Sequence, residues 1–431
     1  MHPVAAIVLV SVILAALMVG ISWLARRFSW EAELARKAVH VSLGTVTLSF
    51  PWLFDELWPV LVLGVLAISG FLILRMKRSL REGVGGALHG VERRTFGEIY
   101  FTLAVALVFW LSKGDPILYC IPILILTVAD AAGALVGKRY GETGYATLSG
   151  RKSAEGSVTI FTATFFSAHI PLLLAAPELS RSGTLLVALT LAVLVMLFEA
   201  VATHGLDNLC IPFGGWFALQ RFMDKTDGEM AIRLLVLVIL LGMVMIVRKR
   251  SSLDGSAILG AVLYGFLCWS LGSWLWFLPP LILFASHLIH TPLVQKVDAK
   301  LNHDLRSILG LAATTIAWML IGTVFQRQPD YYVVPFTIVI AGYFAMTSFG
   351  TLAVLKPDWP RSLRIILVSL KAVILSFLPL LAFNGWSSAP LIALPAVLFT
   401  VWAFSQVDPE NPRRRWQQAL VVFAISFIGL V

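Results

Sequence analysis

The sequence predicts an all-α membrane protein, a polytopic transmembrane helical bundle with about 15–16 membrane segments in two halves. Of its 431 residues, 58% are hydrophobic and only 13% are charged, and the mean hydropathy is +0.87. Apolar runs of about 17–25 residues, the length that crosses a bilayer core, recur from end to end. Because a backbone in lipid must satisfy its own hydrogen bonds, these runs have to be helical.

The net charge of +9 does not indicate a nucleic-acid partner. The Lys and Arg residues gather in short loops between apolar runs, which is the pattern that orients membrane helices. Cys120, Cys210 and Cys268 lie apart in apolar surroundings, so neither a metal cluster nor a disulfide framework is expected. The first apolar run, 4–23, lacks a basic n-region and a small-residue cleavage site, and we expect a retained helix.

The apolar runs predict crossings throughout the chain. In the first half they lie roughly at 4–23, 37–54, 57–74, 96–112, 116–136, 154–175, 183–203 and 231–247. In the second half they lie roughly at 256–270, 273–289, 307–324, 331–350, 363–383, 389–405 and 416–431.

The charges of the loops orient these helices. Alternate loops are basic, and the loops between them are nearly free of Lys and Arg. The basic groups are Arg26, Arg27, Arg36 and Lys37; then Arg75, Lys77, Arg78, Arg81, Arg93 and Arg94; then Lys138, Arg139, Arg151 and Lys152. Basic loops are cytoplasmic by the positive-inside rule, which puts the N-terminus outside.

One further crossing is needed to keep this rule in the second half. If 204–230 were a single cytoplasmic loop, Arg248-Lys249-Arg250 and the later basic loops would lie outside. The one apolar stretch available is 209–219, which is short and contains Pro212, Gly214 and Gly215. We therefore expect this stretch to dip into or cross the membrane as an irregular helix, buried in protein or lining a cavity.

The cluster of basic residues at 248–252 and the Asp254-Gly255 turn predict a boundary between two domains, 1–250 and 251–431. The first domain concentrates acids and bases near one membrane face. The second has few ionisable groups within its helices, and its role is left open. Ionisable residues inside membrane segments are costly and are functional candidates, so the search for a site begins in the first domain.

Asp130 lies near the cytoplasmic end of its predicted helix. Gly133, Gly137 and Gly141 follow at i+3, i+7 and i+11, close to one helical face. Small residues at this spacing let a second backbone or a ligand approach closely. Helix packing and nucleotide binding therefore both remain possible for the glycines.

The stretch Arg151-Lys152-Ser153-Ala154-Glu155-Gly156 opens the next apolar helix. Ser153 is a suitable N-cap. The free N–H groups at the helix start, together with Arg151 and Lys152, form a natural phosphate cradle. Glu155 would be favoured in the first turn by the helix dipole alone, which is the alternative to a catalytic role.

Two further acids are expected at the same membrane face. Glu199 lies inside an apolar run, and Asp207-Asn208 follows shortly after it. With Asp130 and Glu155 this makes four carboxylates, which suit Mg²⁺ bridging substrate phosphates. Pairing with a nearby Lys or Arg is the alternative for Glu199.

Two upstream stretches also point to this face. Arg36, Lys37 and His40 open the second crossing, and Glu98 lies slightly inside the fourth. Arginines at helix ends commonly extend toward lipid headgroups. His40 and Glu98 cannot reach water easily, so they are candidate site residues.

These residues together resemble the polyprenol kinase family, which includes phytol kinase, dolichol kinase and the CTP-dependent diacylglycerol kinase. The pattern is an Asp, small residues at spacing four, and Lys-(Ser/Thr)-x-Glu-Gly; Gly133 stands where an Ala is usual. The later acid, the Asp-Asn-x-x-x-Pro segment and the early Arg-Lys-x-x-His also match, and residues 96–100 look like the phytol kinase branch in particular. The resemblance covers roughly residues 30–247.

The resemblance implies phosphoryl transfer from CTP, or another nucleotide, to a lipid alcohol such as phytol, with Mg²⁺ or another divalent cation. It implies a multi-pass protein in the lipid bilayer whose site faces the cytoplasm; it does not indicate an oligomeric state. The catalytic candidates are Asp130, Lys152, Glu155, Glu199 and Asp207, of which Asp130, Glu199 and Asp207 are the metal candidates. The nucleotide-binding candidates are Gly133, Gly137, Lys138, Gly141, Arg151, Lys152, Ser153, Gly156 and Asn208. The auxiliary candidates are Arg36, Lys37, His40 and Glu98.

Two alternatives stay open. CDP-diacylglycerol synthases share part of the pattern, but their Pro-Gly-His-Gly-Gly segment is replaced here by 212–215, which lacks the His. A non-catalytic lipid transporter or scaffold would account for the many helices.

Residues 253–290 are similar to the opening of a membrane family that includes the kinase of phytyl phosphate. The later acids of that family are absent, since 346–350 contains no carboxylate.

Overall fold

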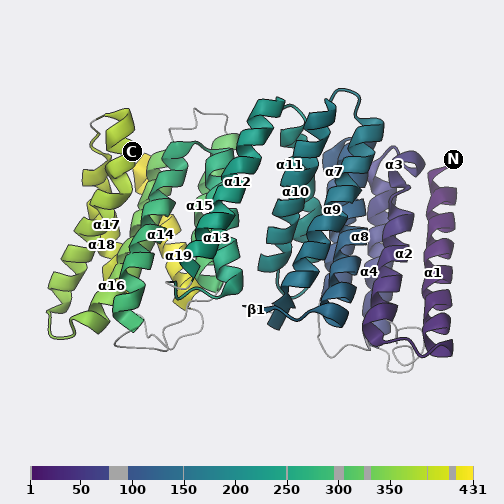
Figure 1. The fold of residues 1–431 in the computed structure, drawn as a ribbon, viewed down its shortest axis with the longest axis horizontal. Coiled ribbons are helices and arrows are strands. Elements are labelled where there is room, and N and C mark those ends of the chain that lie inside the picture. The colour runs from purple at the N-terminus through teal and green to yellow at the C-terminus, as the bar shows by residue number, and fades with distance from the viewer. Residues whose placement is uncertain are drawn as a thin grey trace. The chain divides into compact units, whose positions relative to one another are not determined.

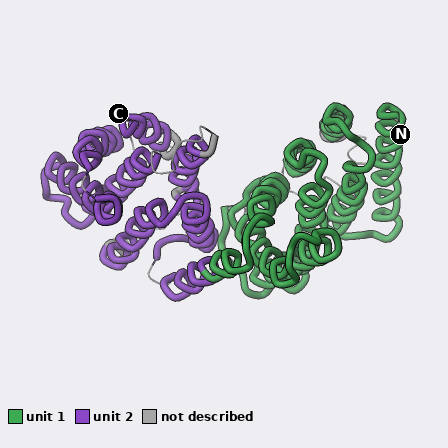
Figure 2. The backbone as a smooth tube through the Cα atoms, turned by 90° about the horizontal axis from the view of Figure 1, so that it is seen from above, with its two compact units in different colours: residues 1–235 green, residues 236–431 purple. Residues whose placement is uncertain are grey.

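A computed structural model describes all residues except 1, 77–95, 149, 249–250, 296–304, 325–331, 386, 407–413 and 431. The basic loops expected at 77–94, 249–250, 296–300 and 413 therefore lie wholly or partly outside the described residues. The chain divides into two compact units, 1–235 and 236–431, and each is described by itself (Figure 2). The boundary falls inside one helix, Asp227–Val247.

The first unit is almost entirely helical (Figure 1). Its elements are α1 (Pro3–Arg27), α2 (Ala32–Thr47), α3 (Phe50–Leu53), α4 (Leu57–Met76), α7 (Gly97–Ser112), α8 (Pro116–Tyr140), β1 (Gly144–Thr147), β2 (Gly150–Ser153), α9 (Ala154–Ala175), α10 (Arg181–Val201), α11 (Asp207–Phe222) and the start of α12 (Asp227–Val247). The strands β1 and β2 form an antiparallel hairpin, which the sequence reasoning did not predict.

The second unit contains the rest of α12 and the helices that follow it. These are α13 (Gly255–Leu271), α14 (Trp274–Gln295), α15 (Leu305–Val324), α16 (Val333–Leu355), α17 (Arg361–Asn384), α18 (Ala389–Gln406), α19 (Arg414–Ser426) and the short η3 (Phe427–Leu430). Helix α16 is its centre and packs against α14, α15, α17, α18 and α19. Its core is aromatic, with Trp318, Phe336, Phe344 and Phe377 fully buried.

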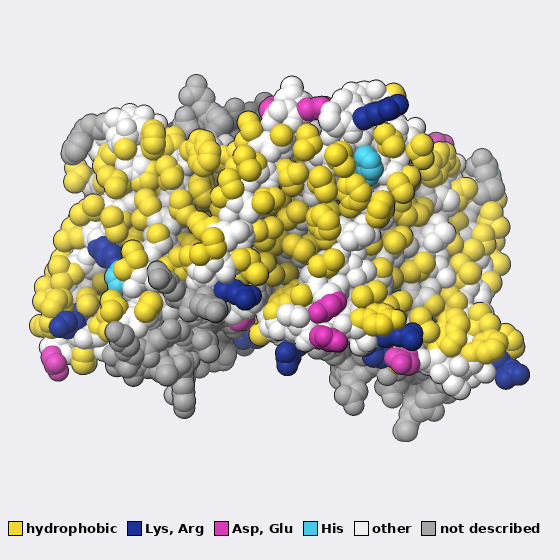
Figure 3. All heavy atoms as spheres, viewed as in Figure 1, with side chains coloured by type: hydrophobic (Ala, Val, Ile, Leu, Met, Phe, Trp, Pro, Cys, Tyr) yellow, Lys and Arg dark blue, Asp and Glu magenta, His cyan; other side chains and the backbone are white. Residues whose placement is uncertain are grey.

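The predicted multi-pass membrane bundle is confirmed. Among the described residues, nine helices are long and apolar enough to cross a membrane, and five apolar helices are shorter. Large apolar side chains such as Val12, Leu174 and Phe383 are exposed at 61%, 79% and 71%, which suits a surface that faces lipid. On the face of the first unit drawn in Figure 3, hydrophobic side chains cover the middle and charged ones lie toward the two ends.

Polar residues begin several of these helices. Asp115 accepts hydrogen bonds from the Ile117 and Leu118 N–H groups at 2.8 and 3.2 Å, and Ser180 accepts one from Gly183 at 2.8 Å. In the second unit, Asp254 accepts one from Ala257 at 2.8 Å. Each cap satisfies backbone donors that have no partner within their own helix, so the helix starts are encoded locally.

Helix α8 is the centre of the first unit. It packs against α2, α7, α9 and α11, and Tyr119, Ile123 and Leu126 on it are fully buried. The Tyr119 hydroxyl donates to the Thr47 carbonyl at 2.9 Å. A polar residue on the inner face of α8 is therefore surrounded by protein on several sides.

The stretch expected at 209–219 belongs to α11, which is one continuous helix of 16 residues in spite of Pro212. Helix α11 leads away from the end of the unit where α10 finishes. The following α12 starts beside the beginning of α10, where the Ser180 hydroxyl donates to Asp227 Oδ2 at 2.7 Å. Helix α11 is thus regular where an irregular segment was expected, and the crossing that the loop charges require stays a prediction.

Candidate active site

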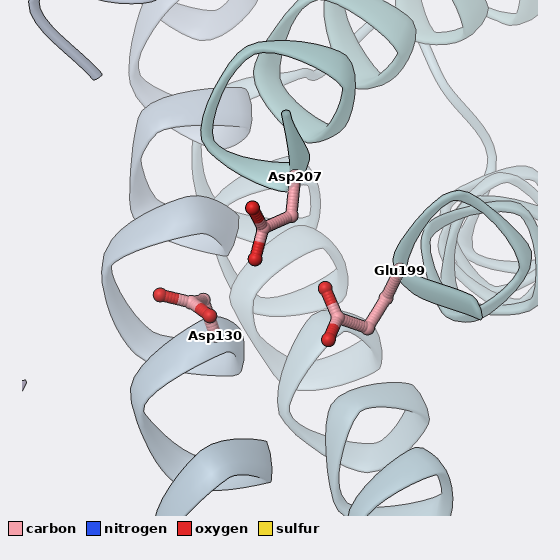
Figure 4. A group of neighbouring side chains, drawn as sticks. All are labelled: Asp130, Glu199 and Asp207. Carbon is pink, nitrogen blue, oxygen red and sulfur yellow. The ribbon is translucent and has the colours of Figure 1, made fainter. Parts of the chain in front are cut away.

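Three carboxylates from distant parts of the sequence meet in the first unit. Asp130 of α8, Glu199 of α10 and Asp207 of α11 each present an oxygen, and these oxygens lie within 4.8 Å of one another (Figure 4). Asp130 is 6% exposed, and Glu199 and Asp207 are half-buried. Among the described residues, this is the group of acids, His and Cys that is close enough to share a metal ion.

The chain brings Glu199 and Asp207 together with a tight turn. Glu199 lies in the last turn of α10, and Asp207 in the first turn of α11. Between them, His204 and Gly205 have φ angles of 55° and 90°, a left-handed conformation that allows an abrupt reversal. The N-terminal end of α11 also favours a negative charge at Asp207.

Two lysines flank the acids. The Lys37 ammonium lies 2.6 Å from Asp130 Oδ2, and His40 Nε2 lies 3.4 Å from the same oxygen. On the other side, the Lys152 ammonium lies 2.7 Å from Glu199 Oε1 and also donates to the Glu199 carbonyl. The lysine side chains are 3% and 23% exposed, and such buried charges are tolerated because they are paired.

The lysines do not satisfy all the carboxylate oxygens. Glu199 Oε2 and Asp207 Oδ1 are buried and have no hydrogen-bond partner among the described residues. A buried, unpartnered charged oxygen is costly, and three close carboxylates repel one another. A divalent cation with oxygen preference, such as Mg²⁺, would remove both costs, so the donor set fits a metal held by Asp130, Glu199 and Asp207.

The hairpin of β1 and β2 positions Lys152. Tyr145 stands opposite Lys152 in the strand register, and the Tyr145 and Ser157 hydroxyls are 3.0 Å apart. Burial lowers the pKa of Lys152, but the neighbouring Glu199 carboxylate raises it further, and the net pKa is above the usual value. Lys152 therefore carries its positive charge at neutral pH.

Tyr145 is a neighbour of the site that the sequence reasoning missed. Burial raises its pKa above the usual value, so the hydroxyl is neutral. The signal that could have found it is the stretch 144–147, where a Tyr and a Thr alternate with smaller residues before a turn at Gly150, whose φ is 121°. Aromatic and β-branched residues are typical of strands, but a four-residue strand gives a weak pattern.

Ser153 is the N-cap of α9, as predicted, and its Oγ accepts from the Gly156 N–H at 3.1 Å. The Glu155 carboxylate accepts from the backbone N–H groups of Glu142 and Thr143 at 3.2 and 3.1 Å. Glu155 thus fastens the loop that precedes the hairpin and is not part of the group of three acids. These contacts give it a positioning role, and a catalytic role stays a prediction.

The predicted glycines lie where α8 and α9 pack against each other. A Cβ at Gly137 would meet Ser153 Oγ at 3.0 Å and Gly156 Cα at 3.4 Å. A Cβ at Gly156 would meet the Gly133 carbonyl at 3.0 Å, and one at Gly141 would collide with the Gly137 carbonyl. Close helix packing accounts for these glycines, and direct contact with a nucleotide remains a prediction.

The fold places some of the predicted basic residues at the three acids and others away from them. Lys138 pairs with Glu31 at 2.6 Å on the surface, and Arg36 pairs with Glu33 at 2.6 Å. Arg151 is exposed and extends toward Gly144, and because neighbouring strand residues point to opposite faces, it lies on the other face from Lys152. Of the predicted basic groups, Lys37 contacts Asp130 and Lys152 contacts Glu199.

Asn208 lies beside Asp207 and joins α11 to the start of α7, where Glu98 lies. Asn208 follows Asp207 on α11, is 6% exposed, and donates from Nδ2 to the Gly97 carbonyl at 2.9 Å. Its Oδ1 is buried without a partner among the described residues. Glu98 follows Gly97 in the first turn of α7, so α7 and α11 bring it to the same end of the unit.

A comparison with known proteins identifies the family. A phytol kinase from Synechocystis sp. is 33% identical to this chain over 185 residues, which cover 76% of that protein and 42% of this chain. The chain belongs to the phytol kinase family. No protein-family model and no solved structure matches the chain. Membership in the phytol kinase family confirms the predicted resemblance and agrees with the multi-pass helical fold.

Proposed function

We propose that this protein is a membrane kinase that transfers the γ-phosphoryl group of CTP to the hydroxyl of a lipid alcohol such as phytol. The observation that carries the proposal is the group of three carboxylates between Lys37 and Lys152, in which two oxygens have no partner among the described residues. The Synechocystis relative is a phytol kinase, which supports a lipid alcohol as acceptor. The basic loops support a site that opens to the cytoplasm, where CTP is available.

Phosphoryl transfer needs charge neutralisation and in-line positioning more than covalent chemistry. Asp130, Glu199 and Asp207 would hold a divalent cation, which would supply positive charge to stabilise the phosphates. Lys152 has a fixed position on β2 and a full positive charge, so it is suited to bind the phosphate oxygens. Lys37 holds the Asp130 carboxylate in place from the opposite side at 2.6 Å.

The lipid hydroxyl has to reach the same group of acids from within the bilayer. Asp130 and His40 lie on the side of the site formed by α8 and α2. We assign to them the positioning of the acceptor hydroxyl. The nucleotide then reaches the three acids from the side of Lys152, and the alcohol reaches them from the side of His40.

The proposal is tested with purified full-length protein, phytol and CTP labelled at either the γ or the α phosphorus. Label from the γ position entering the lipid, with Mg²⁺ present, is the expected result. Label from the α position entering the lipid would instead support a cytidylyltransferase. Absence of lipid labelling with CTP and with ATP, across a panel of lipid alcohols, would contradict the kinase and favour a transporter or scaffold.

A further inference from the structure

The first unit contains an apolar cavity of about 320 Å³ among α1, α2, α3, α4 and α7. Its volume lies within the range of about 300–1,000 Å³ that is typical of small-molecule sites. None of the described residues that line it is ionisable. The hydroxyls of Thr47 and Thr102, which do line it, donate to the Gly44 and Glu98 carbonyls of their own helices at 2.9 Å. The cavity therefore offers a hydrocarbon environment.

Small residues on α4 create much of this space. Gly64, Ala67 and Gly70 lie three residues apart and line the cavity, so they share a face of the helix. A Cβ at Gly70 would meet nothing within 4 Å, and one at Gly64 would meet only Thr102 Cγ2 at 3.4 Å. The lining residues of α4 run from Val60 to Phe71, about 16 Å at 1.5 Å per residue.

The cavity lies near the candidate active site, and two side chains separate it from Asp130. Phe101 lines it and packs edge-on against the His40 ring, with centroids 5.2 Å apart. His40 Nε2 in turn lies 3.4 Å from Asp130 Oδ2. Along the same face of α2, the residues after His40 at i+3 and i+7, Leu43 and Thr47, also line the cavity. One end thus lies at Phe101, with the His40 ring between it and Asp130, and the cavity extends from there along α2 and α4.

We propose that this cavity binds the hydrocarbon chain of the acceptor alcohol, which rests on the proposed kinase function. The chain lies along α4, and its hydroxyl passes Phe101 and His40 to reach Asp130. The length, the apolar lining and the position beside Phe101 and His40 favour a single extended chain, such as an isoprenoid alcohol. A lipid with two acyl chains would need a wider space. Gly64, Ala67 and Gly70 then determine which chains are accepted.

The first test compares Ala67→Phe with Val65→Phe. Val65 is on the same helix but 65% exposed, so it is a matched control for the added ring. Filling the cavity at Ala67 should lower kcat/KM for phytol by about 10–200-fold. It should affect a short isoprenoid alcohol, geraniol, much less, while Val65→Phe changes neither. Retained activity on geraniol also shows that Ala67→Phe is folded. An Ala67→Phe variant with the same ratio of phytol to geraniol activity as the natural protein would overturn the proposal.

The second test needs no variant. A phytol analogue with a diazirine at the end of the chain far from the hydroxyl is bound to the full-length protein and irradiated. Labelled peptides from α1, α3 or α4, with labelling suppressed by excess phytol, are the expected result. Labelling confined to the second unit or to the outer face of α4 would overturn the proposal. This result does not depend on turnover, so it is separable from a failure of the kinase assay.

Discussion

The two units of this protein differ in the groups that surround their buried or half-buried lysines. In the first unit, Lys37 and Lys152 each contact a carboxylate, at 2.6 and 2.7 Å. In the second, Lys371 lies 3.3 Å from His290 Nε2, 3.4 Å from Ser286 Oγ and 5.2 Å from the centre of the Phe344 ring. No carboxylate partner of Lys371 is present in the part of the second unit that the structure describes.

This difference accompanies another: among the described residues, the group of acids that could hold a metal ion lies in the first unit. A divalent cation needs several oxygen ligands, and the first unit provides three carboxylates within 4.8 Å. Around Lys371, the described residues provide the His290 imidazole and the Ser286 hydroxyl. We therefore expect phosphoryl transfer to depend on the acids of the first unit, and the predictions below test that division.

The largest effect is expected from breaking the ion pair between Lys37 and Asp130. Lys37→Met leaves the Asp130 charge buried without its partner, which should destabilise the protein by about 3–5 kcal/mol. Thermal unfolding in detergent measures the change. The double variant Lys37→Met/Asp130→Asn removes both charges and should recover much of the loss. Equal destabilisation by the single and double variants would show that the charge pair is not the cause.

Asp207→Asn tests the metal site with less damage to the fold, because no ion pair of Asp207 is present among the described residues. Removing a ligand oxygen should reduce lipid phosphorylation by about 10²–10³-fold. Asp224→Asn is the control, since Asp224 is an exposed acid beyond the far end of α11. Activity of Asp207→Asn within a few-fold of Asp224→Asn would remove Asp207 from the site.

Glu155→Gln should have a smaller effect. The weakened hydrogen bonds to Glu142 and Thr143 should cost about 1 kcal/mol of stability, because the change loosens the loop before the hairpin. The loss of kcat should then remain below that of Asp207→Asn. A loss as large as that of Asp207→Asn, in a protein of unchanged thermal stability, would instead give Glu155 a catalytic role.

The smallest effect is expected in the second unit. Lys371→Gln should leave lipid phosphorylation close to that of the natural protein, because none of the three acids is among the contacts of Lys371. The matched change Lys152→Gln should reduce activity strongly. If Lys371→Gln lowers kcat/KM as much as Lys152→Gln, the second unit participates in the reaction and the comparison between the units fails.

Much of the site could be predicted from the sequence because its parts are polar residues in apolar runs. Asp130, Glu199 and Asp207 were recognisable in this way, and their common membrane face followed from the loop charges. The contact between Lys37 and Asp130 joins residues 93 positions apart and depends on how α2 packs against α8. Helical periodicity gives the face of each helix but not its neighbour, so such pairs could not be assigned.

The features that the sequence did not predict correctly have local causes. The strands β1 and β2 are four residues each, too short for an alternating pattern to stand out between helices. Pro212 and two glycines indicated an irregular segment, yet α11 is continuous because packing against α7, α8 and α10 supports it. From the sequence, Gly133, Gly137 and Gly156 could serve either helix packing or ligand contact. The position of α9 against α8 shows that these glycines lie in a helix–helix interface.

The account depends most directly on a divalent cation bound by Asp130, Glu199 and Asp207. Binding of Mn²⁺, as a probe for this site, can be measured by electron paramagnetic resonance on the purified full-length protein, with Asp207→Asn and Asp224→Asn as comparisons. We predict saturable Mn²⁺ binding by the natural protein and by Asp224→Asn, weakened at least ten-fold in Asp207→Asn. Equal Mn²⁺ affinity in all three proteins would contradict the account.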